Sequence, residues 1–505
     1  MDLNGFPILS LITFVPILGS VLVLFIPDKN EKAIKWTALV VSLIPLALSV
    51  VLWLNYDSSV PGMQFVEDYR WFDTVNSRFR MGVDGISVPM IFLTALLTPA
   101  AVLYSFSIKE RVKAYFALFL MLEMGMFGVF TSLDMVLFYV FWEIGLVPMY
   151  FLIYIWGSAN RKYAALKFFI FTLSGSVLML LAIQVMYLAT GTFHVLEWMG
   201  NLQPFLGGNK VWFLDSEIAR RLAFWAFFIA FAIKVPVWPF HTWLPDAHTE
   251  APTAGSMLLA GVLLKLGCYG FLRLVLPIFP DMAQTYAPVI AVLGLAGVIL
   301  GGLAAMAQTD FKRLVAYSSV NHMGFVVLSI ATIASAGATM TDRVIAYNGA
   351  VLQMFNHGIT AAAMFMLVGV VYDRAHTRNL EDFGGLGVVI PVYGGILLFS
   401  TMASLGLPGL NGFVSEFMIF RGAFPAFTIL TVLATIGLVV TAAFLLWMIQ
   451  RVLLGPLNPR WAKIPEISVR EIVAVAPLMV LMLLIGVYPS WILTTINQTV
   501  LNLLG

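Results

Sequence analysis

Apolar runs about twenty residues long recur along this chain, and they restrict its fold more than any other feature. A helix of about 20 apolar residues spans the hydrocarbon core of a bilayer, and residues 6–26 already form such a run. Comparable runs follow at about 35–55, 86–106, 115–133, 134–156, 164–190, 221–247, 252–276, 286–307, 313–333, 344–371, 393–423, 427–453 and 472–496. The sequence therefore predicts an all-α integral membrane protein with about 14 transmembrane helices, because barrel strands are shorter and alternate in polarity.

The composition supports a lipid environment and excludes several other classes. Hydrophobic residues make up 61% of the chain and charged residues 11%, which leaves too little polar surface for a water-soluble domain. The net charge is +2, with Lys and Arg scattered between apolar runs, so no nucleic-acid partner is expected. The one cysteine, Cys268, excludes a disulfide framework and any cluster held by four thiolates of this chain.

Loop charges predict the orientation. The odd-numbered connections between the expected helices carry more Lys and Arg than the even-numbered ones. By the positive-inside rule, the odd connections face the cytoplasm and both termini lie on the non-cytoplasmic side. The first run, 6–26, lacks a basic leader and a small-residue cleavage site, so we expect it to be retained as a helix.

Two of the expected helices are interrupted in a similar way. The seventh contains Pro236 and Pro239, and the twelfth contains LPGLNGF at 407–413. Interrupted helices at matching places indicate an inverted-repeat transporter, although prolines also kink membrane helices for packing alone. The predicted divisions are helices 1–3 in 1–114, a first five-helix repeat in 115–276, a second in 286–453, and helix 14 in 454–505.

Three ionisable residues lie far from any expected helix end: Glu143, Lys234 and Lys265. A charge at that depth costs roughly 3 kcal/mol, so it indicates a partner, a hydrated cavity or an altered protonation state. A carboxylate close to a buried lysine holds the lysine's proton, and separation favours its release. Glu143 and Lys234 are therefore predicted to form a switch.

The interruptions add to this prediction. Pro236 has no N–H, so we expect a carbonyl one turn earlier to lose its helical partner and attract water near Lys234. Glu416 follows the second interruption, where the positive end of the next half-helix favours an acid.

Five further residues are secondary candidates for proton transfer. They are Glu123, His241, His248, His322 and His357. A membrane histidine also serves simply as a hydrogen-bond partner between helices. Lys167 is interpreted as an anchor reaching the membrane surface and Asp134 as a helix cap.

Several motifs resemble the antiporter-like membrane subunits of complex I and of multisubunit cation/proton antiporters. The most specific is KVPVWPFHTWLPDAH at 234–248, followed by EAPT at 250–253 and Lys265; FWE at 141–143 and YSSVNHMG at 317–324 agree. The resemblance covers nearly the whole chain and implies about 14 helices, two inverted five-helix repeats and a mid-membrane chain of Glu, Lys and His.

Within that family the chain resembles the M type. Most members place a lysine at the twelfth-helix interruption, whereas the M type has glutamate, as at Glu416; FNHGIT at 355–360 and HTRNL at 376–380 also look M-type. The resemblance implies that Glu143 modulates Lys234, that Lys265 links two half-channels, and that Glu416 exchanges the proton with the far side.

The resemblance also implies partners and location. No cofactor is expected on this chain; NADH, FMN, iron–sulfur clusters and quinone are expected in partner subunits. L-type and N-type antiporter-like subunits are the expected neighbours, with the peripheral redox arm indirectly connected. The bacterial plasma membrane is the preferred location, with the mitochondrial inner and thylakoid membranes as alternatives.

Two other functions remain open from the sequence. A cation/proton antiporter subunit without redox partners shares Glu143, Lys234 and Lys265, but Glu416 argues against it. A scaffold, in which buried charges only set helix register, is the second alternative.

Overall fold

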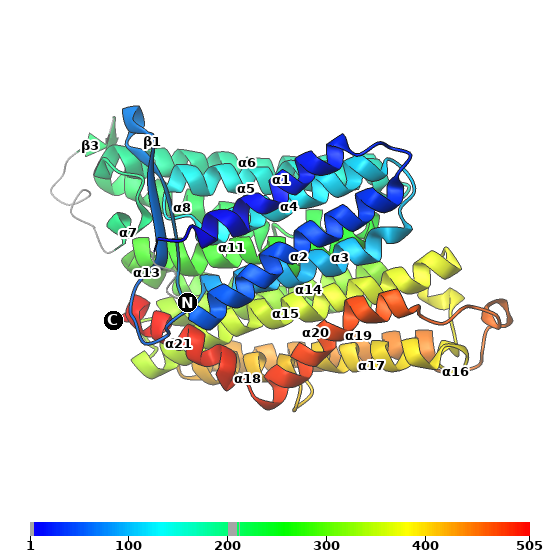
Figure 1. Ribbon diagram of the computed structural model, residues 1–505. Helices are drawn as coiled ribbons and strands as arrows, with labels where there is room; N and C mark the ends of the chain where they lie inside the picture. Colours follow the sequence, from blue (N-terminus) through cyan, green and yellow to red (C-terminus); the bar gives the residue numbers. More distant parts are fainter. Residues whose placement is uncertain (1–4, 200–209, 212) are drawn as a thin grey trace.

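The computed structural model describes residues 5–199, 210–211 and 213–505 as a bundle of long helices that run side by side (Figure 1). Within these residues, twelve helices are long and apolar enough to cross a membrane. The chain is therefore a multi-pass integral membrane protein, as the apolar runs predict.

The elements of the first half follow in chain order. They are α1 (Ile8–Phe25), α2 (Glu31–Asn55), β1 (Gln64–Phe72), β2 (Ser77–Val83), α3 (Ser87–Tyr104), α4 (Val112–Thr131), α5 (Met135–Trp156), α6 (Arg161–Thr190), α7 (Val195–Trp198), β3 (Lys210–Val211), β4 (Leu214–Asp215), α8 (Ser216–Lys234) and α9 (Trp243–Glu250).

The next stretch, 253–278, is helical throughout, with two wider π-helical turns, η4 and η5. It consists of α10 (Thr253–Leu258), η4 (Leu259–Leu263), α11 (Leu264–Gly270), η5 (Phe271–Val275) and α12 (Leu276–Ile278). The remaining helices are α13 (Pro280–Met306), α14 (Phe311–Ala334), α15 (Met340–Ala375), α16 (Leu386–Val389), α17 (Pro391–Leu405), α18 (Asn411–Ala426), α19 (Thr428–Leu453), α20 (Val469–Val487) and α21 (Ser490–Leu504).

Polar side chains mark where several long helices begin. Asp134 accepts hydrogen bonds from Val136 N and Leu137 N at the start of α5, so its predicted role as a cap is confirmed. Asp310 caps α14 in the same way. Each cap satisfies backbone N–H groups that have no partner within the helix.

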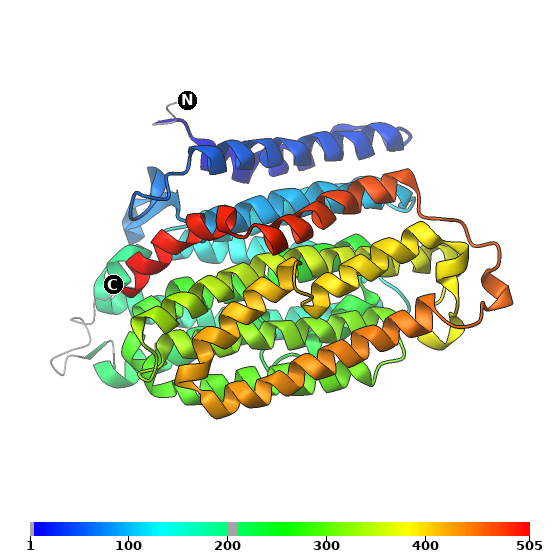
Figure 2. The same ribbon diagram turned by 90° about the horizontal axis from the view of Figure 1, so that it is seen from below.

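Two helical stretches form the centre of the bundle. The most apolar parts of 253–278 and of α15 are fully buried, whereas those of α1, α2, α19 and α20 are less than half buried. Figure 2 shows α1 and α2 on one outer side of the bundle. The central stretches carry Lys265 and His357, so these side chains are enclosed by protein rather than lipid.

Helices α13 and α14 approach each other closely because glycines line their contact. A Cβ on Gly294 would lie 2.7 Å from Leu328 N, and one on Gly324 would lie 2.6 Å from Val298 N. Small residues allow such close backbone contact in membrane helices. This contact packs α14, which carries His322, against α13.

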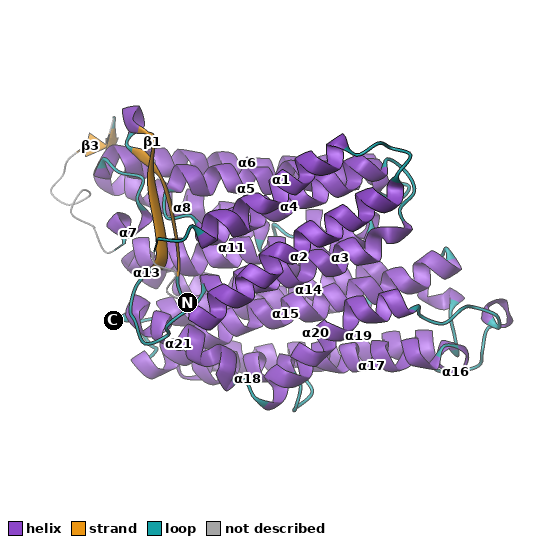
Figure 3. Cartoon of the chain, viewed as in Figure 1, coloured by secondary structure: helices purple, strands orange, loops and turns teal. Residues whose placement is uncertain are grey.

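The connection between α2 and α3 contains a β-hairpin, formed by β1 and β2. β1 and β2 pair antiparallel and lie at one end of the bundle, where α1 begins and α21 ends (Figure 3). We call this the hairpin end and the opposite end, near α16, the loop end. The segment folds because Asp134 anchors it, accepting hydrogen bonds from Ser77 Oγ and Arg78 N at 3.0 Å each.

The last apolar run is also different from its prediction. Residues 472–496 were expected to form one helix, but α20 ends at Val487 and α21 begins at Ser490. Pro489 explains the break, because it has no N–H to donate and disfavours helical geometry at Tyr488.

Replacing Asp134 with alanine is expected to destabilise the protein by about 2 kcal/mol, the upper part of the range for a lost cap, because the hairpin loses its anchor as well. The measurement is the thermal unfolding midpoint in detergent, together with the rate of protease cleavage within 64–83. Asp57→Ala, which removes an exposed carboxylate near the hairpin, should change neither. An unchanged cleavage rate in Asp134→Ala would show that the hairpin is held by other contacts.

Candidate functional site

Glu143 and Lys234 come from neighbouring parts of the first half of the bundle. Glu143 lies within α5, and Lys234 is the last residue of α8, where only 2% of its surface is exposed. Lys234 Nζ lies 4.9 Å from the centre of the Trp142 ring. An aromatic face stabilises a cation at this distance.

Neither charge is neutralised by direct contact. Among the described residues, Lys234 Nζ and Glu143 Oε1 have no hydrogen-bond partner. Glu143 still acts electrostatically on Lys234, and its polar neighbour is Tyr139, one turn earlier on α5. The structure therefore shows two opposite charges that are near each other but unpaired.

The backbone after Lys234 corrects one expectation. Ala232 O accepts a hydrogen bond from Val237 N at 2.8 Å, and Ile233 O accepts one from Trp243 Nε1 at 2.8 Å. The predicted unpaired carbonyl is therefore wrong, since the turn and a tryptophan replace the donor that Pro236 lacks. Lys234 remains at the negative end of α8, which favours a cation.

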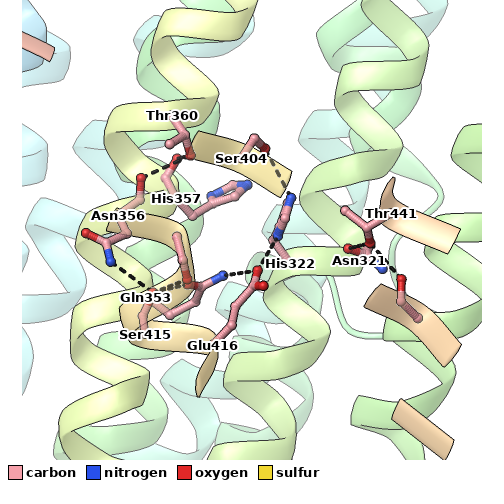
Figure 4. A network of polar contacts seen from close by, with 12 residues as sticks. Asn321, His322, Gln353, Asn356, His357, Thr360, Ser404, Ser415, Glu416 and Thr441 are labelled. Carbon is pink, nitrogen blue, oxygen red and sulfur yellow. Dashed lines mark hydrogen bonds and ion pairs between the residues drawn. The ribbon is translucent and has the colours of Figure 1, made fainter. Parts of the chain in front are cut away.

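Four of the predicted residues form one buried chain in the second half of the bundle. Lys265 Nζ lies 2.7 Å from His357 Nδ1. The ring centres of His357 and His322 are 5.6 Å apart. His322 Nδ1 lies 3.1 Å from Glu416 Oε1 (Figure 4). We call Lys265, His357, His322 and Glu416 the histidine relay; each of these residues is at most 5% exposed.

Neutral polar side chains surround the far end of the histidine relay (Figure 4). Gln353 Nε2 donates to Glu416 Oε1 at 3.4 Å, and Ser404 Oγ lies 3.3 Å from His322 Nε2. Ser415 Oγ donates to Gln353 Oε1 at 2.6 Å. A cavity of about 10 Å³ lies among these groups, which is the space of roughly one water molecule.

The sequence-based selection missed these supporting residues, although a signal was present. Gln353, Asn356, His357 and Thr360 are spaced at three and four residues within an apolar helix. Such spacing places them on one helix face. That they line the histidine relay could not be predicted without the position of α18, because α18 supplies Ser415 and Glu416.

Glu416 follows an interruption between two helices. α17 ends at Leu405 and α18 begins at Asn411, so Glu416 lies in the second turn of α18. The N-terminal end of a helix stabilises negative charge. The predicted position of Glu416, near the positive end of the helix after the interruption, therefore agrees with the structure.

The secondary candidates divide into two groups. His248 stacks on Phe365 with ring centres 4.4 Å apart, and its electrostatic neighbours are Lys312 and Lys265. His248 therefore lies beside the histidine relay. His241 instead faces Tyr317, with ring centres 6.3 Å apart.

Glu123 makes no hydrogen bond to either group of charges among the described residues. It is fully buried in α4, and within the described part of the chain neither of its carboxylate oxygens has a hydrogen-bond partner. The structure therefore does not bring Glu123 into the histidine relay.

Lys167 forms an ion pair that the sequence did not predict. Its Nζ lies 2.6 Å from Asp246 Oδ2, so it joins α6 to α9. An ion pair is favoured there because both side chains are about four-fifths buried. Lys312, at the loop end, donates to the carbonyl of Ala251 and borders a cavity of about 230 Å³.

Comparison with known proteins identifies relatives along the whole chain. Residues 132–442 match the family described as NADH:quinone oxidoreductase/Mrp antiporter, TM. A Rhodobacter capsulatus protein named NADH-quinone oxidoreductase subunit M is 42% identical, with 98% of this chain and 96% of that protein covered. An Arabidopsis thaliana protein named NADH-ubiquinone oxidoreductase chain 4 is 40% identical, with 98% and 96% covered.

Solved structures agree with this fold. A chain of respiratory complex I from Thermus thermophilus is 26% identical, with a TM-score of 0.85 over 98% of this chain and all of that one. A chain of the Mrp complex from Dietzia, 21% identical, has the same fold, with a TM-score of 0.85 over 100% of this chain and 98% of that one. The chain therefore belongs to the NADH:quinone oxidoreductase/Mrp antiporter family of membrane subunits and resembles subunit M within it.

Proposed function

We propose that this chain is a proton-translocating membrane-arm subunit of a respiratory NADH:quinone oxidoreductase. The observation that carries the proposal is the histidine relay, in which titratable side chains from α11, α14, α15 and α18 meet inside the bundle. Ionisable groups at this depth are costly, and a row of them has an evident use in passing protons.

The relatives favour this function over a cation/proton antiporter without redox partners. The proteins named as subunits of NADH-quinone and NADH-ubiquinone oxidoreductase reach 42% and 40% identity, whereas the Mrp chain shares the fold at 21%. Most members of the family that this chain resembles carry a lysine at the position of Glu416, whereas the M type carries glutamate. Glu416 therefore also favours the oxidoreductase subunit over the antiporter.

The geometry suggests how a proton moves through the histidine relay. Lys265 and His357 are in direct hydrogen-bond contact, and so are His322 and Glu416. Between the two histidines the ring centres are 5.6 Å apart. A rotation of one ring, or a water molecule in the adjacent cavity, closes this step. Glu416 then exchanges the proton with the far side.

Glu143 and Lys234 act as the switch that supplies protons to the histidine relay. With the two side chains unpaired, as in the structure, Lys234 is held mainly by the Trp142 face and tends to release its proton. When Glu143 moves closer, its carboxylate stabilises the ammonium and the proton is retained. Quinone reduction in partner subunits supplies the signal that moves Glu143.

The architecture supports a repeat-based transporter. α8 ends at Lys234 before α9 begins at Trp243, and α17 ends at Leu405 before α18 begins at Asn411. We propose that each pair crosses the membrane as one discontinuous helix. The described residues contain twelve helices that are each long and apolar enough to cross a membrane. Two discontinuous crossings added to these twelve give the expected fourteen. The two interruptions then mark equivalent places in inverted repeats at 115–276 and 286–453.

The remaining assignments follow from the same proposal. The chain itself carries out no redox step, and NADH, FMN, iron–sulfur clusters and quinone belong to partner subunits. L-type and N-type antiporter-like subunits flank it in the membrane arm. The hairpin end faces the non-cytoplasmic side, and the membrane is the bacterial plasma membrane.

Purification from the native membrane in mild detergent tests the proposal directly. Peripheral flavin and iron–sulfur subunits are expected to co-purify with the chain, and the preparation should oxidise NADH with a quinone acceptor. Recovery of small membrane chains alone, with no flavin absorbance, would instead support the antiporter alternative.

A further inference from the structure

The two ends of the histidine relay determine where its two histidines carry their protons when Lys265 is protonated and Glu416 is ionised. Lys265 Nζ lies 2.7 Å from His357 Nδ1, and a lysine ammonium only donates hydrogen bonds. His357 Nδ1 is then the acceptor, so the neutral ring carries its proton on Nε2. Glu416 Oε1 lies 3.1 Å from His322 Nδ1, and a carboxylate only accepts. The proton of His322 therefore lies on Nδ1, which makes its Nε2 an acceptor.

These assignments leave one donor and one acceptor without each other between the two rings. His357 Nε2 is buried and has no hydrogen-bond partner among the described residues. A buried N–H without a partner costs free energy, so an acceptor beside it is favoured. On the other ring, His322 Nε2 lies 3.3 Å from Ser404 Oγ, near the end of α17. Because this nitrogen accepts, the hydroxyl of Ser404 donates to it.

Space for one water molecule lies beside these three side chains. His357, Ser404 and His322 all border the cavity of about 10 Å³, and one water molecule needs roughly 10 to 15 Å³ of such space. Figure 4 shows the side chains of His357 and Ser404 both turned toward His322. A hydroxyl that donates one hydrogen bond still accepts others. A water molecule in this cavity therefore accepts from His357 Nε2 and donates to Ser404 Oγ.

We propose that Ser404 is a proton-transfer residue that joins His357 to His322 through this water molecule. Lys265 gives a proton to His357 Nδ1, and His357 gives its Nε2 proton to the water. The water gives one of its protons to Ser404 Oγ, whose own proton passes to His322 Nε2. His322 then gives its Nδ1 proton to Glu416.

The protons in this sequence balance. The histidines, the water and Ser404 each lose one proton for the one that they gain, so none of them keeps a charge. Lys265 ends as a neutral amine and Glu416 as a neutral carboxylic acid. The transfer runs from Lys265 to Glu416 because the first donates and the second accepts at the start. The inference rests on the proposed function, since this link matters only where the histidine relay carries protons.

The test compares variants of Ser404 that differ in the hydroxyl group, by the initial rate of NADH-driven proton uptake into membrane vesicles. Ser404→Ala is expected to lower the rate about tenfold, less than the roughly hundredfold loss of a group that carries the proton itself, because water replaces part of the link. Ser404→Thr keeps the hydroxyl and should stay near the unmodified rate. Ser404→Val has the shape of threonine without the hydroxyl, so it should be at least as slow as Ser404→Ala.

A matched control and an isotope measurement distinguish a lost link from altered packing. Ser400 lies one turn earlier on α17, is fully buried, and has no hydrogen-bond partner for its hydroxyl among the described residues. Ser400→Ala should therefore take up protons at the unmodified rate. In Ser404→Ala the transfer between the histidines limits uptake, so heavy water should slow this variant by a larger factor than it slows the unmodified complex.

Three results would overturn the link: normal uptake by Ser404→Ala, equal rates for Ser404→Thr and Ser404→Val, or an equal loss in Ser400→Ala. Co-purification of the flavin subunits confirms that each variant is assembled. The proposed function is judged separately, by NADH-driven proton uptake in the unmodified complex. An unmodified complex that pumps, together with Ser404→Ala at the same rate, removes the link and leaves the proposed function intact.

Discussion

Lys234→Ala is expected to lower NADH-driven proton uptake about one hundredfold, the usual scale for removing a group that transfers protons. Alanine carries no proton, so the charge of Glu143 no longer has a buried base to act on. The measurement is the initial rate of proton uptake into membrane vesicles. Lys234→Arg should fail as well, because arginine keeps the charge over Trp142 but does not release its proton under these conditions.

The arginine variant separates proton transfer from a scaffold role. If the buried charge only set helix register, Lys234→Arg would keep the charge and restore pumping. Lys113→Ala is the matched control, because that ammonium pairs with Asp28 at 3.1 Å near the surface. It should pump normally. Normal pumping by an assembled Lys234→Ala complex would rule out the switch.

Glu416→Gln is expected to cause a loss of similar size, about one hundredfold. Glutamine still accepts hydrogen bonds from His322 and Gln353, so the packing of α18 against α15 is kept. It does not gain or lose a proton near neutral pH, which stops the final transfer. Proton uptake by vesicles is again the measurement, with NADH oxidation as the check on assembly.

The length of the side chain gives a second test at this position. Glu416→Asp keeps the titrating group but moves it away from His322, which lies 3.1 Å from the native carboxylate. Its rate should fall between those of the unmodified complex and Glu416→Gln. Glu217→Gln, which removes an exposed carboxylate paired with Arg221, should leave proton uptake unchanged. Equal rates for Glu416→Gln and the unmodified complex would exclude Glu416 from the path.

Sequence patterns predicted the helical elements well because lipid leaves few choices. A backbone in hydrocarbon must satisfy its own hydrogen bonds, so an apolar run of sufficient length becomes a helix. The same patterns failed where a long-range contact or a single proline decides the structure. The hairpin at 64–83 depends on Asp134, more than fifty residues away, and the break at Pro489 was hidden within an apolar run.

The candidate site was predictable residue by residue but not as an arrangement. A charged or histidine side chain inside an apolar run is conspicuous, which is why Glu143, Lys234, Lys265 and Glu416 were found. Their contacts were not visible in the pattern. Glu123 and His357 are each an ionisable residue inside an apolar run, yet only His357 joins the histidine relay.

The sequence by itself determined that the chain crosses a membrane and which titratable side chains are held there, because burial of charge is costly wherever it occurs. Only the tertiary structure decided which of them touch. Lys265 and His357 are 92 residues apart, and His322 and Glu416 are 94 apart. Packing of α11, α14, α15 and α18 brings them together, and such packing depends on the shapes of whole helices rather than on any short run of residues.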